Sequence, residues 1–360
     1  MALSRISGVG NVIFKRLIDR FQSPRKVFQA GVEELKQVDG IRTTTVQAIT
    51  RFRGDAGAEQ ESERIKNRGI AFLTLHDKRY PALLKTIYDP PPFLYVRGEL
   101  RESDDQALAV IGSRSASAYG RETTRRITRT LAQQGFTVVS GLARGIDSTA
   151  HQGALEAGGR TIAVLGSGID VIYPPENTAL AEKIAGQGAV VTEFPLGTPP
   201  EATNFPGRNR IISGLSLGTV IVEASMRSGS LITARLALEQ GREVFAIPGN
   251  INSPWSRGTN SLIKEGAQLV MNAEDIIAEI LPQSARPHRS EEMEAAVFQK
   301  LSPEGKKILD LMEADPLHID TLIQKSGLHS AQVSSILLDL ELNGVIKQLS
   351  GKLFVKAVTP

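Results

Sequence analysis

Six short apolar runs alternate with helical stretches across the middle of the chain, and this pattern constrains the fold most strongly. The runs are ALAVIG, FTVVSG, RTIAVLG, GAVVTEF, GTVIVEA and REVFAIPG, and residues 121–134 and 231–240 are among the helical stretches. Continuous apolar strands separated by helices are typical of a parallel sheet covered on both faces. The sequence therefore predicts an α/β fold, with a Rossmann-like, doubly wound, mostly parallel sheet over residues 70–281.

The amino-terminal segment, residues 1–54, has a different pattern of short helices joined by glycine turns. SGVGNVIFKRLIDRF and LKQVDGIRTTTVQAITRF each place a small-residue turn before an amphipathic helix. This segment resembles a small helical domain of the helix-hairpin-helix or SAM-like type, and free amides at such turns suit a phosphate oxygen. The alternative, that these glycines only close helix corners, stays open. Residues 55–69 are predicted to form a connecting helix.

The carboxyl-terminal segment is predicted to be a separate domain. Residues 282–300 have the charged, proline-containing composition of a linker, and residues 301–360 contain three helical patterns followed by a short hairpin. That order predicts a winged-helix-like domain. Its would-be recognition helix, His329–Asn343, has no Lys or Arg but two acids, Asp339 and Glu341. Because phosphate binding depends on cations, we expect a protein-contact or regulatory role for this domain.

Composition excludes several function classes. The chain has no cysteine and only five scattered histidines, so we expect neither a disulfide nor a metal site. No apolar run approaches the length of a membrane span, and the amino terminus lacks the order of a signal peptide, so a cytoplasmic location without a membrane partner is expected. The net charge is only +3, so an anionic partner requires a local patch of cations.

Ligands of doubly wound sheets bind beyond the carboxyl ends of the strands, so the residues that follow each apolar run are the candidates for ligand binding. Gly112-Ser113-Arg114 follows the first run. The glycine permits close approach of the backbone to a ligand, the serine has a hydroxyl, and the arginine can bind a phosphate with two hydrogen bonds. Because the next glycine is Gly120 and no acid ends the second strand, the dinucleotide fingerprint is absent and NAD binding is not expected.

The second run is followed by SGLARGIDSTAH, which contributes Arg144 as a further candidate cation. Asp147 and His151 stand four residues apart, so on a helix they share a face and are able to form an acid–base pair. In the simpler interpretation Asp147 caps the helix and His151 is a packed neighbour. We favour the structural interpretation because no nucleophile lies nearby in the sequence.

The stretch NFPGRNR, read here as a loop, places an aromatic ring beside two cations. Phe205 has a ring face, Arg208 and Arg210 have guanidinium groups, and Asn204 and Asn209 add amides. Single-stranded nucleic acid binds such a combination, with a base stacked on the ring and the backbone along the charges. A mononucleotide is able to use the same groups, and the alternative that Phe205 only anchors the loop to the core also stays open.

Two later stretches contain further polar candidates. The helix start at Ser228–Ser230 has backbone amides that suit an anion, and Arg257, Asn260 and Lys264 follow the last predicted strand. We expect these groups to extend the same groove, so that several strand ends form one basic trough.

These motifs together resemble the DNA-processing protein A family, also called Smf. The resemblance includes the Gly-Ser-Arg turn, SGLARGIDSTAH, YPPEN, FPGRNRIISGLS, SGSLITARLALEQGREVFAIPGN and RGTNSLIKEGA, in order over residues 70–281. It implies a protein that binds and protects single-stranded DNA during natural transformation and loads the RecA recombinase. It also implies a homodimer formed through the Rossmann-like domain, without a cofactor or catalysis. The predicted DNA-binding residues are Gly112, Ser113, Arg114, Arg144, Asn204, Phe205, Arg208, Asn209, Arg210 and Lys264.

The sequence leaves two other functions as alternatives. Nucleoside-monophosphate phosphoribohydrolases of the same fold class have a P-G-G-x-G-T-x-x-E run, whereas this chain has LSLGTVIVEA. Its Glu223 stands four residues after Thr219 instead of three, which turns the acid to the other face of the strand and disfavours hydrolysis. The other alternative is a regulatory protein whose winged helix binds protein or duplex DNA.

Overall fold

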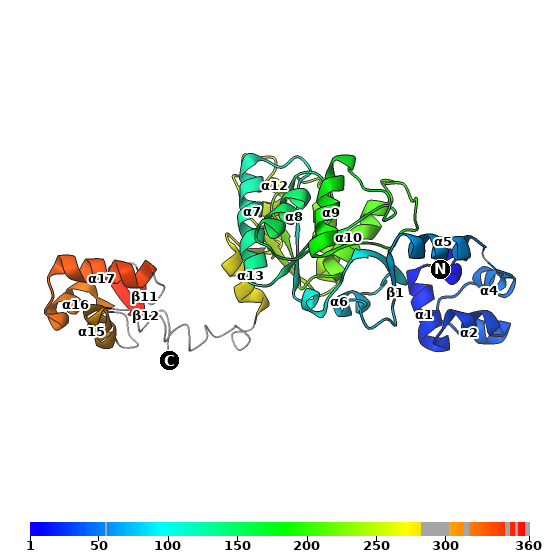
Figure 1. Cartoon of the computed structure of the whole chain (residues 1–360), viewed down its shortest axis with the longest axis horizontal. Coiled ribbons are helices and arrows are strands. Elements are labelled where there is room, and N and C mark those ends of the chain that lie inside the picture. Colours follow the sequence, from blue (N-terminus) through cyan, green and yellow to red (C-terminus); the bar gives the residue numbers. More distant parts are fainter. Residues whose placement is uncertain (55, 282–301, 313–316, 343–345, 350–351, 357–360) are drawn as a thin grey trace. The chain divides into compact units, whose positions relative to one another are not determined.

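The computed structural model describes residues 1–54, 56–281, 302–312, 317–342, 346–349 and 352–356 (Figure 1). The chain divides into two compact units, Met1–Leu281 and Pro282–Pro360. The predicted linker, residues 282–300, lies outside the described residues. In the part of the chain that is described, no helix is long and apolar enough to cross a membrane.

A nine-stranded sheet forms the centre of the first unit and confirms the predicted parallel fold. The strand order is β1-β2-β6-β5-β4-β3-β7-β8-β9, and all neighbours from β6 to β9 are parallel. The six predicted runs became β3 (Ala107–Ile111), β4 (Thr137–Ser140), β5 (Thr161–Val164), β6 (Ala189–Thr192), β7 (Gly218–Ile221) and β8 (Glu243–Ala246). The sequence analysis did not identify the two antiparallel strands β1 (Ala71–Thr74) and β2 (Phe93–Gly98), or the short β9 (Gln268–Leu269).

Helices cover both faces of this sheet because side chains alternate along its strands. In β3, Ala107, Ala109 and Ile111 belong to the core of one face, whereas Leu108 and Val110 belong to the other. The first face packs against α6 (Ala82–Lys85), α10 (Asn204–Gly214), α11 (Gly229–Glu239) and α12 (Arg257–Lys264). The second packs against α7 (Ala118–Gln133), α8 (Ile146–Glu156), α9 (Thr178–Gln187) and α13 (Ala273–Ile280).

The strand order reverses between β3 and β7. From β3 the chain passes through α7 to β4 on one side, and from β7 it passes through α11 to β8 on the other. The loops that follow the two strands, residues 112–117 and 222–228, therefore lead in opposite directions and leave space between them. This is the switch point at which doubly wound proteins bind ligands.

The amino-terminal residues form the predicted group of short helices and pack on the edge of the sheet. The elements are η1 (Ala2–Arg5), α1 (Asn11–Phe21), α2 (Pro24–Gln29), α3 (Val32–Lys36), α4 (Thr43–Thr50) and the connecting helix α5 (Ala56–Asn67). Glu61 of α5 joins this group to the sheet. Its buried carboxylate accepts hydrogen bonds from the Arg5 side chain, the Tyr95 hydroxyl (2.6 Å) and the Leu196 amide (3.1 Å).

The second unit has the predicted winged-helix arrangement in its described residues. Three helices, α15 (Pro303–Leu311), α16 (Ile319–Ser326) and α17 (Ser330–Leu342), share a core that includes Leu322, Val333 and Leu337. A three-stranded antiparallel sheet of β10 (Leu317–His318), β12 (Leu353–Lys356) and β11 (Ile346–Leu349) completes it. The helix expected at residues 329–343 corresponds to α17, and Asn343 lies outside the described residues.

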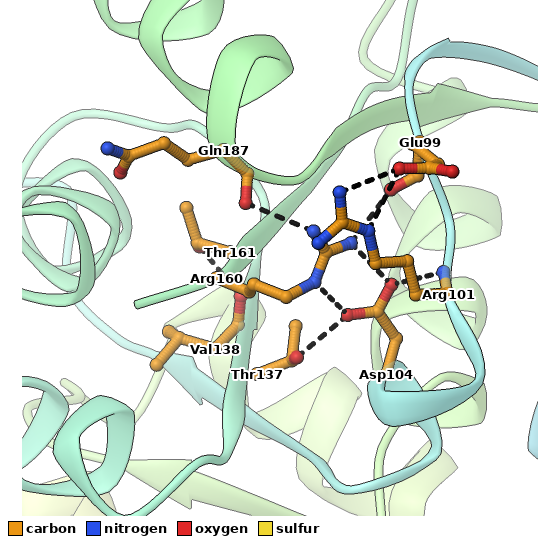
Figure 2. Close-up of polar contacts among 8 residues, drawn as sticks. All are labelled: Glu99, Arg101, Asp104, Thr137, Val138, Arg160, Thr161 and Gln187. Atoms are coloured by element: carbon orange, nitrogen blue, oxygen red, sulfur yellow. Dashed lines mark hydrogen bonds and ion pairs between the residues drawn. The ribbon is translucent and has the colours of Figure 1, made fainter. Parts of the chain in front are cut away.

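An ion pair between the buried Asp104 and the half-buried Arg160 holds the amino ends of the central strands together (Figure 2). Nε and Nη2 of Arg160, before β5, each donate to one oxygen of Asp104 in η2 (Glu102–Asp105), both at 2.8 Å. The Thr137 hydroxyl and the Arg101 amide also donate to Asp104 at 2.8 Å, and Arg160 donates to the Glu99 carbonyl at 2.8 Å. The polar groups at this edge of the sheet are therefore engaged in stabilising the fold.

Replacing Asp104 with asparagine should lower the free energy of unfolding by about 2 kcal/mol, because several hydrogen bonds lose their charged acceptor. Urea unfolding of the two proteins measures the difference. The control is Glu99→Gln, an exposed member of the same group of contacts, which should change stability by less than about 0.5 kcal/mol. Equal effects of the two substitutions would contradict the structural role given to Asp104.

Candidate functional site

A cavity of about 640 Å³ opens at the switch point, beyond the carboxyl ends of β3 and β7. The loops after β3 and β7 and the starts of α10 and α11 form its walls. Six of the ten predicted residues line the cavity: Gly112, Ser113, Arg114, Phe205, Arg208 and Asn209. The other lining residues are Ile111, Ser115, Ala143, Asp147, Tyr173, Pro200, Ala202, Pro206, Ile212, Ser225, Ser228, Gly229, Ser230, Ile232 and Thr233.

The Gly-Ser-Arg turn presents an exposed cation at this cavity. A Cβ atom at Gly112 would lie 2.9 Å from the Glu223 carbonyl oxygen, so glycine is required where the ends of β3 and β7 approach each other. Arg114 is exposed, and its guanidinium carbon lies 5.3 Å from the centre of the Phe205 ring. This distance is typical of a cation–π contact. The turn therefore brings a charge next to the aromatic ring, whereas the sequence analysis had placed the ring beside Arg208 and Arg210.

The stretch NFPGRNR is the start of helix α10, not the loop that the sequence analysis assumed. Pro206 lies within the first turn, where its missing amide hydrogen costs no intrahelical bond. On a helix, residues spaced by three, four and seven positions share a face. Phe205, Arg208, Asn209 and Ile212 have that spacing, and all four line the cavity.

Arg208 does not present the free guanidinium group that was expected. Its side chain is buried, with 4% of its surface exposed, and Nη1 donates to the carbonyls of Gly141 (2.6 Å) and Val164 (2.7 Å). Burial lowers the pKa of Arg208 to about 10, so the group stays charged at neutral pH. Arg208 therefore joins the ends of β4 and β5 beneath the cavity.

Arg210 also differs from expectation, because it lies on another side of α10 and outside the cavity lining. It is buried, with its Nε 3.2 Å from an Asp89 carboxylate oxygen and its Nη2 bonded to the Glu193 carboxylate. Asn11 of α1 donates to the same Glu193 oxygen at 3.3 Å. Arg210 thus helps to hold α10 against the rest of the unit, and its buried guanidinium group is not accessible to a phosphate.

Asp147 and His151 do not form an acid–base pair with each other. Asp147, in the first turn of α8, accepts a hydrogen bond from the Gly141 amide at 3.1 Å; burial raises its pKa and the charge of Arg208 opposes the rise. The Thr161 hydroxyl donates to a backbone carbonyl, so Nδ1 of His151 donates to the Thr161 oxygen at 2.7 Å. Burial lowers the pKa of His151 to about 3. Both side chains serve the packing beneath the cavity.

The remaining predicted residues lie outside the cavity lining. Arg144 is exposed and pairs with Glu176, beside a small recess that it shares with Arg114 and Phe205. The Asn204 side chain donates to the Pro199 carbonyl at 3.2 Å. Lys264 was expected in the same groove, but it is the last residue of α12. This helix is about 12 Å long and runs away from the carboxyl ends of the strands towards β9, so Lys264 lies far from the cavity. The trough is therefore shorter on this side than predicted.

Several lining residues were not singled out from the sequence. The ring of Tyr173 lies 6.1 Å from that of Phe205, although the YPPEN run was interpreted mainly as a turn. Ser225 lies in the loop after β7 and directly follows the apolar run GTVIVEA, so the strand-end rule was sufficient to find it. Thr233 lies one turn along α11 from Gly229, and Pro200 precedes α10. Their positions depend on helix orientations that local sequence does not determine.

The carboxylate that a phosphoribohydrolase would require is engaged elsewhere. Glu223 is buried and accepts hydrogen bonds from the amide (2.9 Å) and hydroxyl (2.5 Å) of Ser117, the residue that caps α7. Glu223 is thus part of the helix cap. In the part of the chain that the structure describes, no three His, Asp or Glu side chains gather in a group able to hold a metal ion.

Together, the fold and the site define a doubly wound α/β protein with a polar, arginine-bearing cavity at the switch point of its sheet. Residues 71–281 match the family model for DNA recombination-mediator protein A, and residues 284–352 match that of the DprA winged helix domain. The chain belongs to the DNA recombination-mediator protein A family.

Named relatives and solved structures agree with this assignment. The chain is 35% identical to Protein Smf of Synechocystis sp. over 98% of this chain and 96% of that protein. The X-ray structure of DNA processing protein A from Streptococcus pneumoniae covers 77% of this chain and 96% of its own, with 36% identity and a TM-score of 0.69. DNA processing protein A from Helicobacter pylori, whose structure concerns its single-stranded DNA binding mode, covers 58% of this chain and 95% of its own, with 32% identity and a TM-score of 0.53.

Proposed function

We propose that this chain is a single-stranded DNA-binding recombination mediator that protects incoming DNA in natural transformation and loads RecA. In this proposal it acts in the cytoplasm, without catalysis or a cofactor. The observation that carries the proposal is the exposed Arg114 guanidinium beside the half-buried Phe205 ring at the cavity. The relative from Helicobacter pylori supports the choice of ligand, because its structure is described for single-stranded DNA binding.

The cavity has the groups that a single strand requires. Arg114 is placed to bind a phosphate, and the start of α11 adds backbone amides at Gly229 and Ser230. Phe205 and Tyr173 present ring surface to a base. The buried positive charge of Arg208 beneath the cavity adds a favourable potential without direct contact.

Replacing Arg114 with alanine should weaken binding of a labelled oligothymidine about tenfold, because a charge-assisted phosphate contact is lost. The slope of log affinity against log salt should fall by about 0.7, the value for one phosphate contact on a single strand. Fluorescence anisotropy at several salt concentrations measures both quantities. Arg101→Ala, which removes an exposed arginine near the opposite edge of the sheet, is the matched control and should change neither.

The same titration, repeated with unlabelled duplex DNA as competitor, tests the type of nucleic acid. Failure of duplex to displace the oligothymidine would support single-strand binding. Complete displacement by an equal amount of duplex would contradict it, and no binding at moderate salt would favour a nucleoside monophosphate as the ligand.

A homodimer formed through the Rossmann-like domain is part of the proposal. The edge strand β9 exposes Leu269, and Met271 is exposed two residues after it; an exposed apolar edge strand is a pairing site. Light scattering should give twice the mass of one chain, and Leu269→Lys should reduce it to a single chain. An unchanged mass in this variant would place the dimer contact elsewhere.

RecA loading is tested separately from DNA binding. The chain should shorten the delay before RecA filaments nucleate on a bound single strand, and Arg114→Ala should lengthen that delay again. Normal DNA binding with no effect on nucleation would remove RecA from the proposal and leave single-strand binding standing.

A further inference from the structure

Large apolar side chains are exposed on the loops after β7 and β8 and at the start of α7. Tyr119, Met226, Ile251 and Trp255 have 55%, 58%, 78% and 39% of their surface exposed, respectively. They belong to the segments that follow β3, β7 and β8, which are adjacent strands of the sheet. Several such side chains at one edge of a sheet are typical of an interaction surface.

The backbone beneath these side chains is held by hydrogen bonds. The Ala224 amide donates to the Trp255 carbonyl at 2.7 Å, which ties the loop after β8 to the end of β7. The Asn260 side chain accepts from the Gly249 amide at 3.2 Å and donates to the Gly249 carbonyl at 3.0 Å. Trp255 therefore stands on an ordered backbone, so less entropy is lost when it binds a partner.

The charge of these loops is positive, and the surface is continuous with the cavity. Ser225 and Ser228 line the cavity, and Met226 and Arg227 lie between them in the sequence. Arg227 and Arg257 are exposed, and neither pairs with an acid among the described residues. A strand of nucleic acid that leaves the cavity on this side meets aromatic rings and unpaired cations.

We infer that the segments 225–227 and 251–257 form a second subsite for the same DNA strand. Bases that leave the cavity stack on Trp255, with the Tyr119 ring nearby, and Arg227 and Arg257 contact the phosphates. This inference rests on the proposed function, and it extends the groove along β7 and β8 where Lys264 does not reach. Unpaired cations beside aromatic side chains fit a single strand better than an apolar protein surface.

The test uses the intrinsic emission of Trp255, which is the only tryptophan in the chain. The full chain is titrated with oligothymidines of about four and about twelve nucleotides. These lengths correspond to a short and an intermediate binding site on single-stranded DNA. Anisotropy of the labelled oligonucleotides is followed in parallel. The short one should bind without changing Trp255 emission, whereas the long one should quench it as binding saturates.

Variants separate stacking from a general effect on the fold. Trp255→Ala should weaken binding of the long oligothymidine about tenfold, within the range for loss of one stacked base, and leave the short one unchanged. Trp255→Phe should restore most of the affinity because it keeps an aromatic face. Leu238→Ala, which truncates an exposed side chain at the far end of α11, is the control and should have no effect. Circular dichroism checks that each variant is folded.

The outcomes distinguish this inference from the proposed function. Binding of both oligonucleotides without any change in Trp255 emission would overturn the second subsite and leave the proposed function intact. If neither oligonucleotide binds, both the second subsite and the proposed function are overturned. A change of emission with protein concentration in the absence of DNA would assign the surface to a second copy of the chain and overturn the inference.

Discussion

Replacing Arg208 with methionine should lower the free energy of unfolding by about 3–5 kcal/mol, the usual effect of removing one member of a buried charged pair. Methionine leaves the carbonyls of Gly141 and Val164 without their donor and removes the cation that offsets the buried carboxyl of Asp147. The ends of β4 and β5 then lose their common contact beneath the cavity. Urea unfolding at neutral pH measures the change.

A comparison with Arg114 tests whether this role is structural. Arg114→Ala should change stability by less than about 0.5 kcal/mol because the side chain is exposed, although it weakens DNA binding. Arg208→Met should have the opposite profile, with a large loss of stability and the salt dependence of binding unchanged in the protein that remains folded. A stable Arg208→Met protein with a flatter salt dependence would restore Arg208 as a direct phosphate contact.

The sheet was predictable because its signal is local and repeated. Each of β3 to β8 is a short apolar run, and burial on both faces of a parallel sheet requires that composition. Strand β9 has only two residues, and β1 has four and lies at the edge. Both residues of β9 are exposed, and β1 has one exposed and two half-buried residues, so neither segment has the largely buried apolar composition that identified β3 to β8.

The sequence predicted most directly those site residues whose position is determined by the end of a strand. The Gly112 turn follows a strand directly, and the structure places it at the cavity. The roles of Arg208 and Arg210 depend on the face of α10 on which each lies. The proline and glycine at positions 206 and 207 concealed that helix in the sequence. The partners of Arg208 lie 67 and 44 positions away along the chain, so local composition could not reveal them.

The contacts of Glu193 connect the amino-terminal helices with the helix that carries Phe205. The Glu193 carboxylate accepts hydrogen bonds from Asn11 of α1 and Arg210 of α10. Three residues further along the chain, the Leu196 amide donates a hydrogen bond to Glu61 of α5. The segment between β6 and α10 is thus fixed at two points by side chains of other elements. We expect the geometry of the cavity wall at α10 to depend on these contacts as well as on the sheet.

Replacing Arg210 with methionine should also lower the free energy of unfolding by about 3–5 kcal/mol at pH 8. Burial raises the pKa of Glu193 above its ordinary value of 4.5, and Arg210 opposes that rise. Without Arg210 the pKa of Glu193 rises further, so the folded protein holds a proton that the unfolded chain has already released. Stability is then lost as pH rises through the folded pKa and is regained as pH falls towards 4.5.

The loss relative to the unsubstituted protein should therefore be larger at pH 8 than at pH 5, as measured by urea unfolding at both values. Arg210→Met combined with Glu193→Gln should recover much of the stability, because the amide needs no cation and can still accept the Asn11 hydrogen bond. An equal loss at both pH values, unrelieved by Glu193→Gln, would show that Arg210 acts through packing or Asp89. The pH dependence and the double variant together separate the buried charge of Glu193 from the shape of the arginine side chain.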